Sequence, residues 1–150
     1  MIDFNYETEF TLDNEGAISN WISDVIKSEG KKEGEINYIF CDDEYLLQIN
    51  QEHLQHDYYT DIISFDYTIG NEISGDMFIS VDRVKDNAVE FNVAFQDELK
   101  RVLVHGILHY CGFNDKSEVE EVLMRSKEDE KLAMFHVEQS IKVKVLLLLN

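Results

Sequence analysis

The order of apolar patterns along the chain limits its fold more than any other feature of the sequence. Four stretches have the alternating or β-branched composition of short strands, and five others repeat their apolar residues at helical spacing. The two kinds of pattern are mixed along the chain. This order predicts an α+β fold with one small mixed sheet of about four strands covered by about five helices. The expected strands are 3–10, 35–41, 60–67 and 76–81, and the expected helices are about 15–30, 42–54, 82–91, 96–111 and 117–137.

Turn-forming and capping residues mark the ends of these elements. Glycines and an asparagine within 70–75 predict a hairpin between the third and fourth strands. Gly112 predicts the end of the helix before it, and a break is expected near Asn92. Ser117 and Glu120 have the spacing of a capping box. Caps for the other helices are expected within 12–15, at 42–43 and at Asp82.

The length and composition are those of a globular protein. The chain has 150 residues, of which 44% are hydrophobic and 29% are charged, so a single domain over 1–150 is expected. The sequence does not predict a structure for the last roughly 12 residues, which form a tail. Their final stretch, IKVKVLLLLN, fits an edge strand or a packing partner, and the sequence leaves its place open.

The charge and cysteine content exclude several classes of protein. With 31 acidic residues against 13 Lys and Arg, the net charge is −18, and no basic stripe for binding free DNA is expected. A role on RNA would need local positive charge, a bound metal or docking onto a larger partner. No apolar run approaches the roughly 20 residues of a membrane helix. No secretion signal is expected from the N-terminal residues, and two cysteines, Cys41 and Cys111, fit packing roles in a reducing cytoplasm.

The stretch HGILHYCGFND, from His105 to Asp115, carries the strongest chemical pattern. His105 and His109 are four apart on a predicted helix, so both imidazoles project from one face. Gly112 allows a sharp turn that brings Asp115 toward the same point. Two imidazoles, one carboxylate and one open position are typical of a catalytic zinc site, whereas structural zinc is usually fully ligated. Cys111 points away from this face and is not expected to be a ligand.

Two alternatives remain open for this stretch. Two histidines four apart on a helix also occur without any metal, although an imidazole pair on an otherwise apolar helix needs polar partners. The spacing also matches a metallopeptidase pattern with Asp as the third ligand. That pattern places a general-base Glu directly after the first His, and here the position holds Gly106.

Three stretches together resemble the YbeY family of bacterial metal-dependent endoribonucleases, which take part in rRNA maturation. HGILHYCGFND is similar to the family's HGxLHLxGYDH, TDIISF at 60–65 to TDVLSF, and GDMFIS at 75–80 to GDIxIS. The resemblance covers about 50–134 well and the N-terminal third loosely.

Two positions depart from the family's pattern. The family holds its metal with three histidines, and the third falls on Asp115, which is also a competent zinc ligand but adds one negative charge. The family's arginine before the third strand falls on Leu54, and a guanidinium is a natural clamp for phosphate. His53 or His56 would supply part of that role, or would be plain surface histidines.

The resemblance implies a zinc-dependent, single-strand-specific endoribonuclease acting on the 3′ end of small-subunit rRNA and in ribosome quality control. The implied partners are single-stranded rRNA and the ribosome or its small-subunit proteins. One Zn²⁺ per chain is expected, although nickel also suits imidazole and carboxylate. Such a metal polarises a phosphoryl oxygen or lowers the pKa of its water to about 7. The alternatives are a ribosome-associated factor with a structural metal and weak or lost nuclease activity, and a metallopeptidase-like hydrolase.

Other polar residues near these motifs are weaker candidates. Ser64 would donate a hydrogen bond to the substrate or be a buried, satisfied serine. Lys100 and Arg101, just ahead of His105 on the helix, would meet phosphate or form a solvated helix face. Asp61 and Asp76 would orient the ligand histidines or cap a turn. The sequence does not identify a general acid or base.

Overall fold

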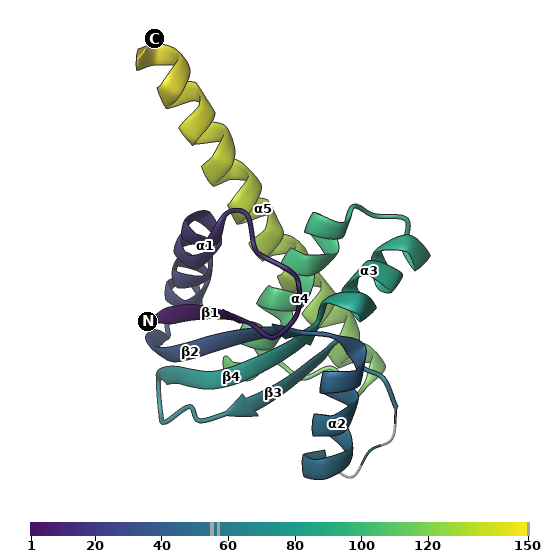
Figure 1. Cartoon of the computed structure of the whole chain (residues 1–150). Coiled ribbons are helices and arrows are strands. Elements are labelled where there is room, and N and C mark those ends of the chain that lie inside the picture. Colours follow the sequence, from purple (N-terminus) through teal and green to yellow (C-terminus); the bar gives the residue numbers. More distant parts are fainter. Residues whose placement is uncertain (55, 57, 150) are drawn as a thin grey trace.

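The computed structural model describes residues 1–54, 56 and 58–149. Within this part of the chain, one four-stranded mixed sheet and five helices form an α+β fold, as predicted (Figure 1). The ends of the elements differ from the sequence expectation, and the last helix continues through the tail that the sequence left unplaced. The elements in chain order are β1 (Ile2–Tyr6), α1 (Glu15–Ser28), β2 (Lys32–Cys41), α2 (Asp43–Leu54), β3 (Ile62–Asp66), β4 (Glu72–Ser80), α3 (Val81–Glu90), α4 (Phe95–Tyr110) and α5 (Glu118–Leu149).

The strands lie in the order β1-β2-β4-β3. β1 is parallel to β2, and β2 is parallel to β4. β3 is antiparallel to β4, with Ser64 opposite Met77 in the register, and the predicted hairpin joins these two strands. β3 is therefore an edge strand of the sheet.

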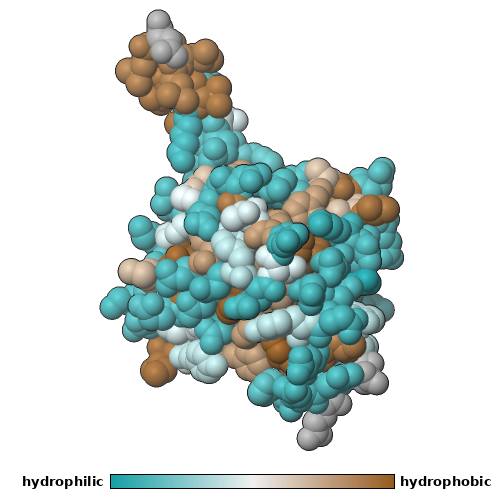
Figure 2. Space-filling model, viewed as in Figure 1, coloured by the Kyte–Doolittle hydropathy of each residue, from teal (hydrophilic) through white to brown (hydrophobic). Residues whose placement is uncertain are grey.

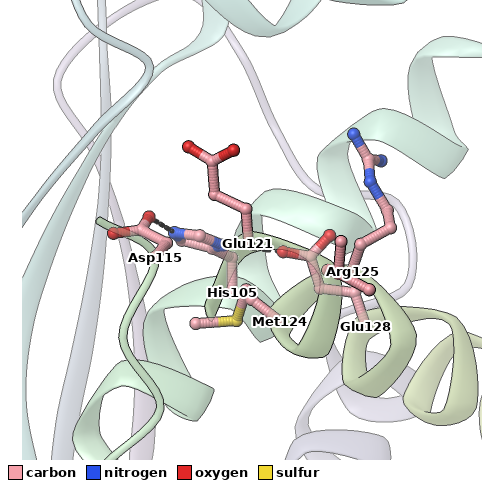
Figure 3. A pocket seen from close by; sticks show the side chains of 7 residues that line it. His105, Asp115, Glu121, Met124, Arg125 and Glu128 are labelled. Atoms are coloured by element: carbon pink, nitrogen blue, oxygen red, sulfur yellow. Dashed lines mark hydrogen bonds and ion pairs between the residues drawn. The ribbon is translucent and has the colours of Figure 1, made fainter. Parts of the chain in front are cut away.

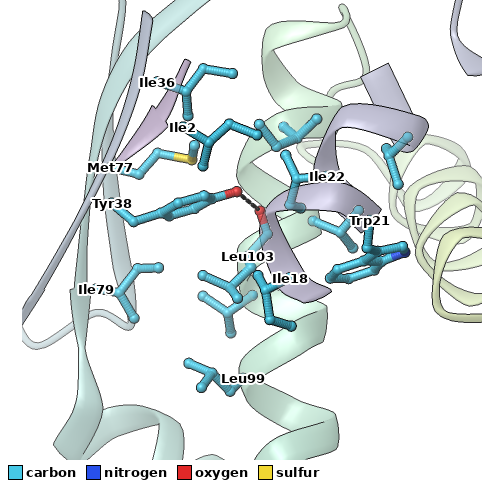
Figure 4. Packing of buried hydrophobic residues seen from close by; sticks show 14 of the residues in the cluster. Ile2, Ile18, Trp21, Ile22, Ile36, Tyr38, Met77, Ile79, Leu99 and Leu103 are labelled. Carbon is cyan, nitrogen blue, oxygen red and sulfur yellow. Dashed lines mark hydrogen bonds between the residues drawn. The ribbon is translucent and has the colours of Figure 1, made fainter. Parts of the chain in front are cut away.

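The main core lies between one face of the sheet and the helices α1, α4 and α5. The hydroxyl of Tyr38 on β2 donates a hydrogen bond to the carbonyl oxygen of Leu103 on α4, at 2.9 Å, in the middle of this core (Figure 4). The indole of Trp21 on α1 donates to the carbonyl of Lys131 on α5, at 2.7 Å. A smaller cluster of Cys41, Leu46 and Ile63 lies under α2 on the opposite face. The sheet thus has a thick side, which carries α4, and a thin side, which carries α2.

Gly106 sets how closely α4 approaches the sheet. A Cβ atom at this position would meet Sδ of Met77 on β4 and would lie 3.1 Å from Cδ1 of Ile62 on β3. The α4 backbone therefore rests directly on these two strands, and the flanking His105 turns to the side of the contact. A glutamate at position 106, as in metallopeptidases, would point into this packed layer.

The helix ends confirm some of the predicted caps and correct others. Ser117 and Glu120 exchange the two hydrogen bonds of a capping box, and Asp42 caps α2 by accepting from the backbone N–H of Tyr45. The expected cap at Asp82 is wrong, because the hydroxyl of Ser80 accepts from Arg83 and α3 begins at Val81. At the start of α1, Asn14 makes no side-chain cap hydrogen bond. The break after α3 falls at Asn92, which has a φ of 55°.

The C-terminal tail, whose place the sequence left open, is helical, so the edge strand that was one of its two alternatives does not form. α5 continues without interruption to Leu149, and its last turns project away from the body of the protein (Figure 1). The side chains from Val145 to Leu149 are exposed, and they form an apolar tip (Figure 2). Within the residues described, no helix is both long and apolar enough to span a membrane.

Candidate metal centre

His105 and His109 project side by side from the last two turns of α4. Their rings meet edge to face, with centroids 4.6 Å apart and an angle of 84° between the ring planes. Both side chains are half-buried, with exposed fractions of 22% for His105 and 30% for His109, so their nitrogens stay reachable from solvent. The predicted shared face of the helix is therefore present.

The turn after α4 brings Asp115 to the two histidines. Gly112, at a φ of 105°, follows the C-cap residue Cys111, and Phe113 donates its backbone N–H to the carbonyl of Leu108. These two features are those of a Schellman motif, which reverses the chain direction. Oδ2 of Asp115 then lies 3.1 Å from Nε2 of His105 and 3.3 Å from Nε2 of His109.

The three side chains together are suited to hold one divalent cation. One donor atom from each of His105, His109 and Asp115 lies within 4.8 Å of the other two. Neutral imidazole and carboxylate are ligands that zinc accepts, and nickel also takes imidazole. A mixed nitrogen and oxygen set of three leaves coordination positions free for water or a substrate oxygen.

Glu128, which the sequence analysis missed, holds His105 from behind. Oε2 of Glu128 on α5 accepts a hydrogen bond from Nδ1 of His105 at 2.7 Å. The Nε2 atom, on the far side of the ring, is then free to face Asp115. Oε1 of Glu128 accepts from Arg101 at 2.8 Å, and Arg101 also pairs with Asp129 at 2.7 Å. A carboxylate behind a ligand histidine fixes the ring and its tautomer.

His105, Glu128 and Arg101 each stabilise the charged form of a neighbour. Burial alone would lower the pKa of His105, but the hydrogen bond to Glu128 and the charges of Glu128 and Asp115 raise it above its ordinary value. Burial alone would raise the pKa of Glu128, but His105 and Arg101 hold it below its usual range. Glu128 is therefore a buried, ionised carboxylate that keeps a proton on Nδ1.

A cavity of about 440 Å³ opens beside His105 and Asp115 (Figure 3). α4 and the turn after it form one side of the cavity, and α5 forms the other. Its lining is mostly acidic and apolar. The residues that line it are His105, Asp115, Glu121, Val122, Met124, Arg125 and Glu128.

The structure places the three catalytic candidates in different surroundings. Ser64 is exposed on β3, and its neighbour in the register is Met77, which faces α4. Lys100 is buried, and its ammonium lies 4.5 Å from the centre of the Phe135 ring. Arg101 is engaged by two carboxylates of α5. The two basic side chains are thus occupied within the protein.

The two aspartates that were expected behind the histidines also differ from each other. Asp61 lines a second hollow that includes His105, but its side chain accepts from Asn87, at 3.4 Å. Burial raises the pKa of Asp61, and the charge of His105 opposes that rise. Asp76 accepts from Asn37, at 2.9 Å, and lines a hollow with Phe78 on the α2 side of the sheet. Asp76 therefore lies on the opposite face from α4.

The positions before β3 also lie apart from the histidine pair. Leu54 is exposed at the end of α2, and its exposed fraction is 42%. His53 meets the ring of Phe65 edge to face on the α2 side, and His56 is bonded to the hydroxyl of Tyr58. These residues do not line either of the described hollows that include His105.

Cys111 carries no sign of a thiolate ligand. Burial and the charge of Glu29 raise the pKa of its thiol to about 11. The thiol therefore stays protonated at neutral pH, in agreement with its role as a packing residue beside the core.

Comparison with known proteins connects this geometry to a family. A family model described as Endoribonuclease YbeY matches residues 3–136. The chain belongs to the YbeY family.

Relatives and a solved structure agree with this assignment. A YbeY of Flavobacterium johnsoniae, named Endoribonuclease YbeY, is 73% identical over 139 residues, which are 93% of this chain and 100% of the relative. A relative of the same name from Flavobacterium psychrophilum is 62% identical over 140 residues, again 93% of this chain and 100% of the relative. The solution structure of TM1509 from Thermotoga maritima is similar to this fold, with a TM-score of 0.65 and 26% identity over 92% of this chain and 93% of that one.

Proposed function

We propose that this YbeY protein is a zinc-dependent endoribonuclease that cleaves single-stranded RNA. The observation that carries the proposal is the convergence of His105, His109 and Asp115 on one point beside an open cavity. Membership of a family whose curated members are named endoribonucleases supports RNA as the substrate.

Each residue of the centre has a distinct task in this proposal. Nε2 of His105, Nε2 of His109 and a carboxylate oxygen of Asp115 hold one zinc ion, and Glu128 orients His105 for that bond. The ion, when bound, acts as a Lewis acid that polarises a phosphoryl oxygen. The cavity lies between α4 and α5 (Figure 3), and the flexible single strand of RNA occupies it in this proposal.

The family resemblance also suggests the pathway, the partner and the location of the proposed nuclease. The pathway is maturation of the 3′ end of small-subunit rRNA and ribosome quality control. The partner is the ribosome or its small-subunit proteins, and the location is the cytoplasm. The net charge of −18 supports docking onto a larger partner over capture of free nucleic acid, since phosphate is repelled by most of such a surface.

A second function, a ribosome-associated factor whose metal is structural, is favoured by one observation. Leu54 stands at the position where the resemblance places an arginine, and no guanidinium replaces it at the end of α2 among the described residues. A metallopeptidase is disfavoured by the place of Gly106, which packs on the sheet and offers no proton acceptor.

The test is cleavage of a labelled single-stranded RNA by the purified full chain with and without zinc. We expect zinc-dependent cleavage that His109→Ala abolishes, while the matched variant His136→Ala, on an exposed histidine of α5, cleaves as well as wild type. Equal cleavage by wild type and His109→Ala would reveal a contaminating nuclease. Ribosome association without cleavage would favour the second function, and a gain of cleavage in Leu54→Arg would show what that position contributes.

A further inference from the structure

The cavity beside His105 and Asp115 has several acidic side chains in its lining, and these repel RNA. Asp115, Glu121 and Glu128 contribute carboxyl groups to it, and the whole chain carries a net charge of −18. A phosphodiester is an anion, so a strand that enters this cavity needs positive charge other than a single metal ion.

Most basic side chains near the histidine centre already form salt bridges or ring contacts within the protein. Arg101 donates to Glu128 and Asp129, and Lys100 is buried over the ring of Phe135. Lys127 and Lys131 share the carboxylates of Glu29 and Glu130, by salt bridges that join α5 to the end of α1. None of these four cations can turn to a ligand without breaking a contact that holds α5 in place.

Arg125 differs from all of them. It is exposed, and within the described part of the chain it makes no ion pair or hydrogen bond. It follows Glu121 by four residues and precedes Glu128 by three, so the three side chains lie along one face of α5, toward α4. In Figure 3 the guanidinium of Arg125 extends past Glu128 and away from it, and no dashed line reaches it.

Three described hollows include Arg125 in their linings, and two of these also include His105. The cavity of about 440 Å³ and a second one of about 230 Å³ share His105, Arg125 and Glu128 in their linings. The second hollow continues toward Asp61 and Asn87, near the start of β3. Arg125 therefore stands where a strand would leave the histidine centre and enter the next hollow.

We infer that Arg125 binds a phosphate group of the RNA strand, next to the phosphodiester at the histidine centre. This inference rests on the proposed function, because it assigns a subsite of the same substrate. A guanidinium is always charged and presents paired N–H donors that match two phosphate oxygens. The charge of Arg125 acts on the carboxyl group of Glu98, which lines the second hollow, but the two form no ion pair. No internal salt bridge of Arg125 among the described residues therefore has to break when RNA binds.

The test measures RNA binding separately from cleavage. A short fluorescent RNA with 2′-O-methyl groups throughout resists cleavage, and its binding to the full chain is followed by polarisation with a chelator present and again with zinc present. We expect Arg125→Ala to weaken binding about tenfold in both conditions. The slope of log K against log salt should fall by about 0.7, which is the value for one phosphate contact on a single strand.

Two further variants make the result specific. Arg125→Lys keeps the charge but not the paired donors, so we expect an intermediate affinity and an unchanged salt slope. Lys85→Ala removes one exposed positive charge from α3, outside both hollows, and should bind RNA as wild type does.

The outcomes separate this inference from the proposed function. If wild type binds no more tightly than Arg125→Ala, including the case in which neither binds, the phosphate subsite is refuted. An equal loss in Lys85→Ala would assign the effect to overall charge and refute it as well. If the chain never cleaves RNA but loses affinity only in Arg125→Ala, the nuclease proposal fails while the phosphate subsite stands.

Discussion

Nδ1 of His105 on α4 lies 2.7 Å from Oε2 of Glu128 on α5, although the two residues are 23 positions apart in the chain. This contact ties the candidate metal centre to a helix that supplies no donor of its own. It also gives α5 a role beyond closing the core, because the helix decides which nitrogen of His105 carries the proton.

Removal of the Glu128 carboxylate should weaken metal binding. We expect Glu128→Ala to lower zinc affinity by about 10- to 100-fold, since the imidazole loses the acceptor that fixes its ring and tautomer. Glu128→Gln should lose less, because its amide oxygen can still accept from Nδ1. Titration of the metal-free protein against a competing chelator measures both values. Glu121→Gln, in the same cavity but without a contact to either histidine, is the matched control, and an equal loss there would contradict the role given to Glu128.

The third donor can be exchanged for the residue that the resemblance places there. We expect Asp115→His to keep one zinc per chain, because imidazole is as suitable a ligand as carboxylate and the turn at Gly112 already places position 115 beside Nε2 of both histidines. Asp115→Ala leaves two donors and should lose the metal during dialysis. Elemental analysis of the dialysed proteins decides, and full zinc retention by Asp115→Ala would remove Asp115 from the ligand set.

Gly106 should be intolerant of even a methyl group. We expect Gly106→Ala to lower the free energy of unfolding by about 1 kcal/mol or more, because overpacking against Met77 and Ile62 costs about 1–3 kcal/mol and the better helix propensity of alanine returns less than about 1. Gly16→Ala, in α1, meets no atom within 4 Å and should instead raise it by up to about 1 kcal/mol. Urea denaturation of the three proteins compares them, and an unchanged midpoint for Gly106→Ala would show that the α4 contact is looser than described.

The contact between α5 and α1 should make stability depend on pH. Burial and a hydrogen bond with Asp24 raise the pKa of Glu138 from its ordinary 4.5 to about 7. The folded state therefore keeps a proton that the unfolded chain has lost, and the resulting stability, complete below about 4.5, disappears as the pH rises through about 7. We expect Glu138→Gln to flatten this decline in unfolding midpoints measured across the range.

Glu130 is a control for the pH series, because its pKa is shifted in the opposite direction from that of Glu138. Hydrogen bonds with Lys131 and Lys127 hold its pKa below the usual range, so its contribution is present at neutral pH and is lost on acidification. Glu130→Gln should therefore reduce stability at neutral pH and leave the decline toward pH 7 unchanged. A flat profile in wild type would show that the carboxyl groups of Glu138 and Asp24 do not meet in solution.

The features that were predicted from the sequence are those set by residues close together in the chain. The shared face of His105 and His109 follows from helical periodicity, and the approach of Asp115 follows from a glycine that ends the helix, so the convergence of the three side chains was predicted without a structure. The cap at Ser80 was missed because Ser80 and the neighbouring Asp82 compete for the same role. The helical tail was missed because it depends on the continuation of α5. Glu128 and Arg125 were missed for a different reason, because their roles arise only when α5 docks against α4. A signal was nevertheless present, since 121, 125 and 128 repeat at the spacing of one helix face.

The three donors lie within the single segment from His105 to Asp115, whereas Glu128 reaches them only through a long-range contact. Such a short loop closes at small entropic cost, so the donors come together as soon as α4 and its Gly112 turn have formed. For the proposed site this means that binding of the ion would not require α5, whereas the orientation of His105 by Glu128 would. If the proposed site is correct, a chain in which α5 has not yet packed would already be able to bind the metal, but with lower affinity.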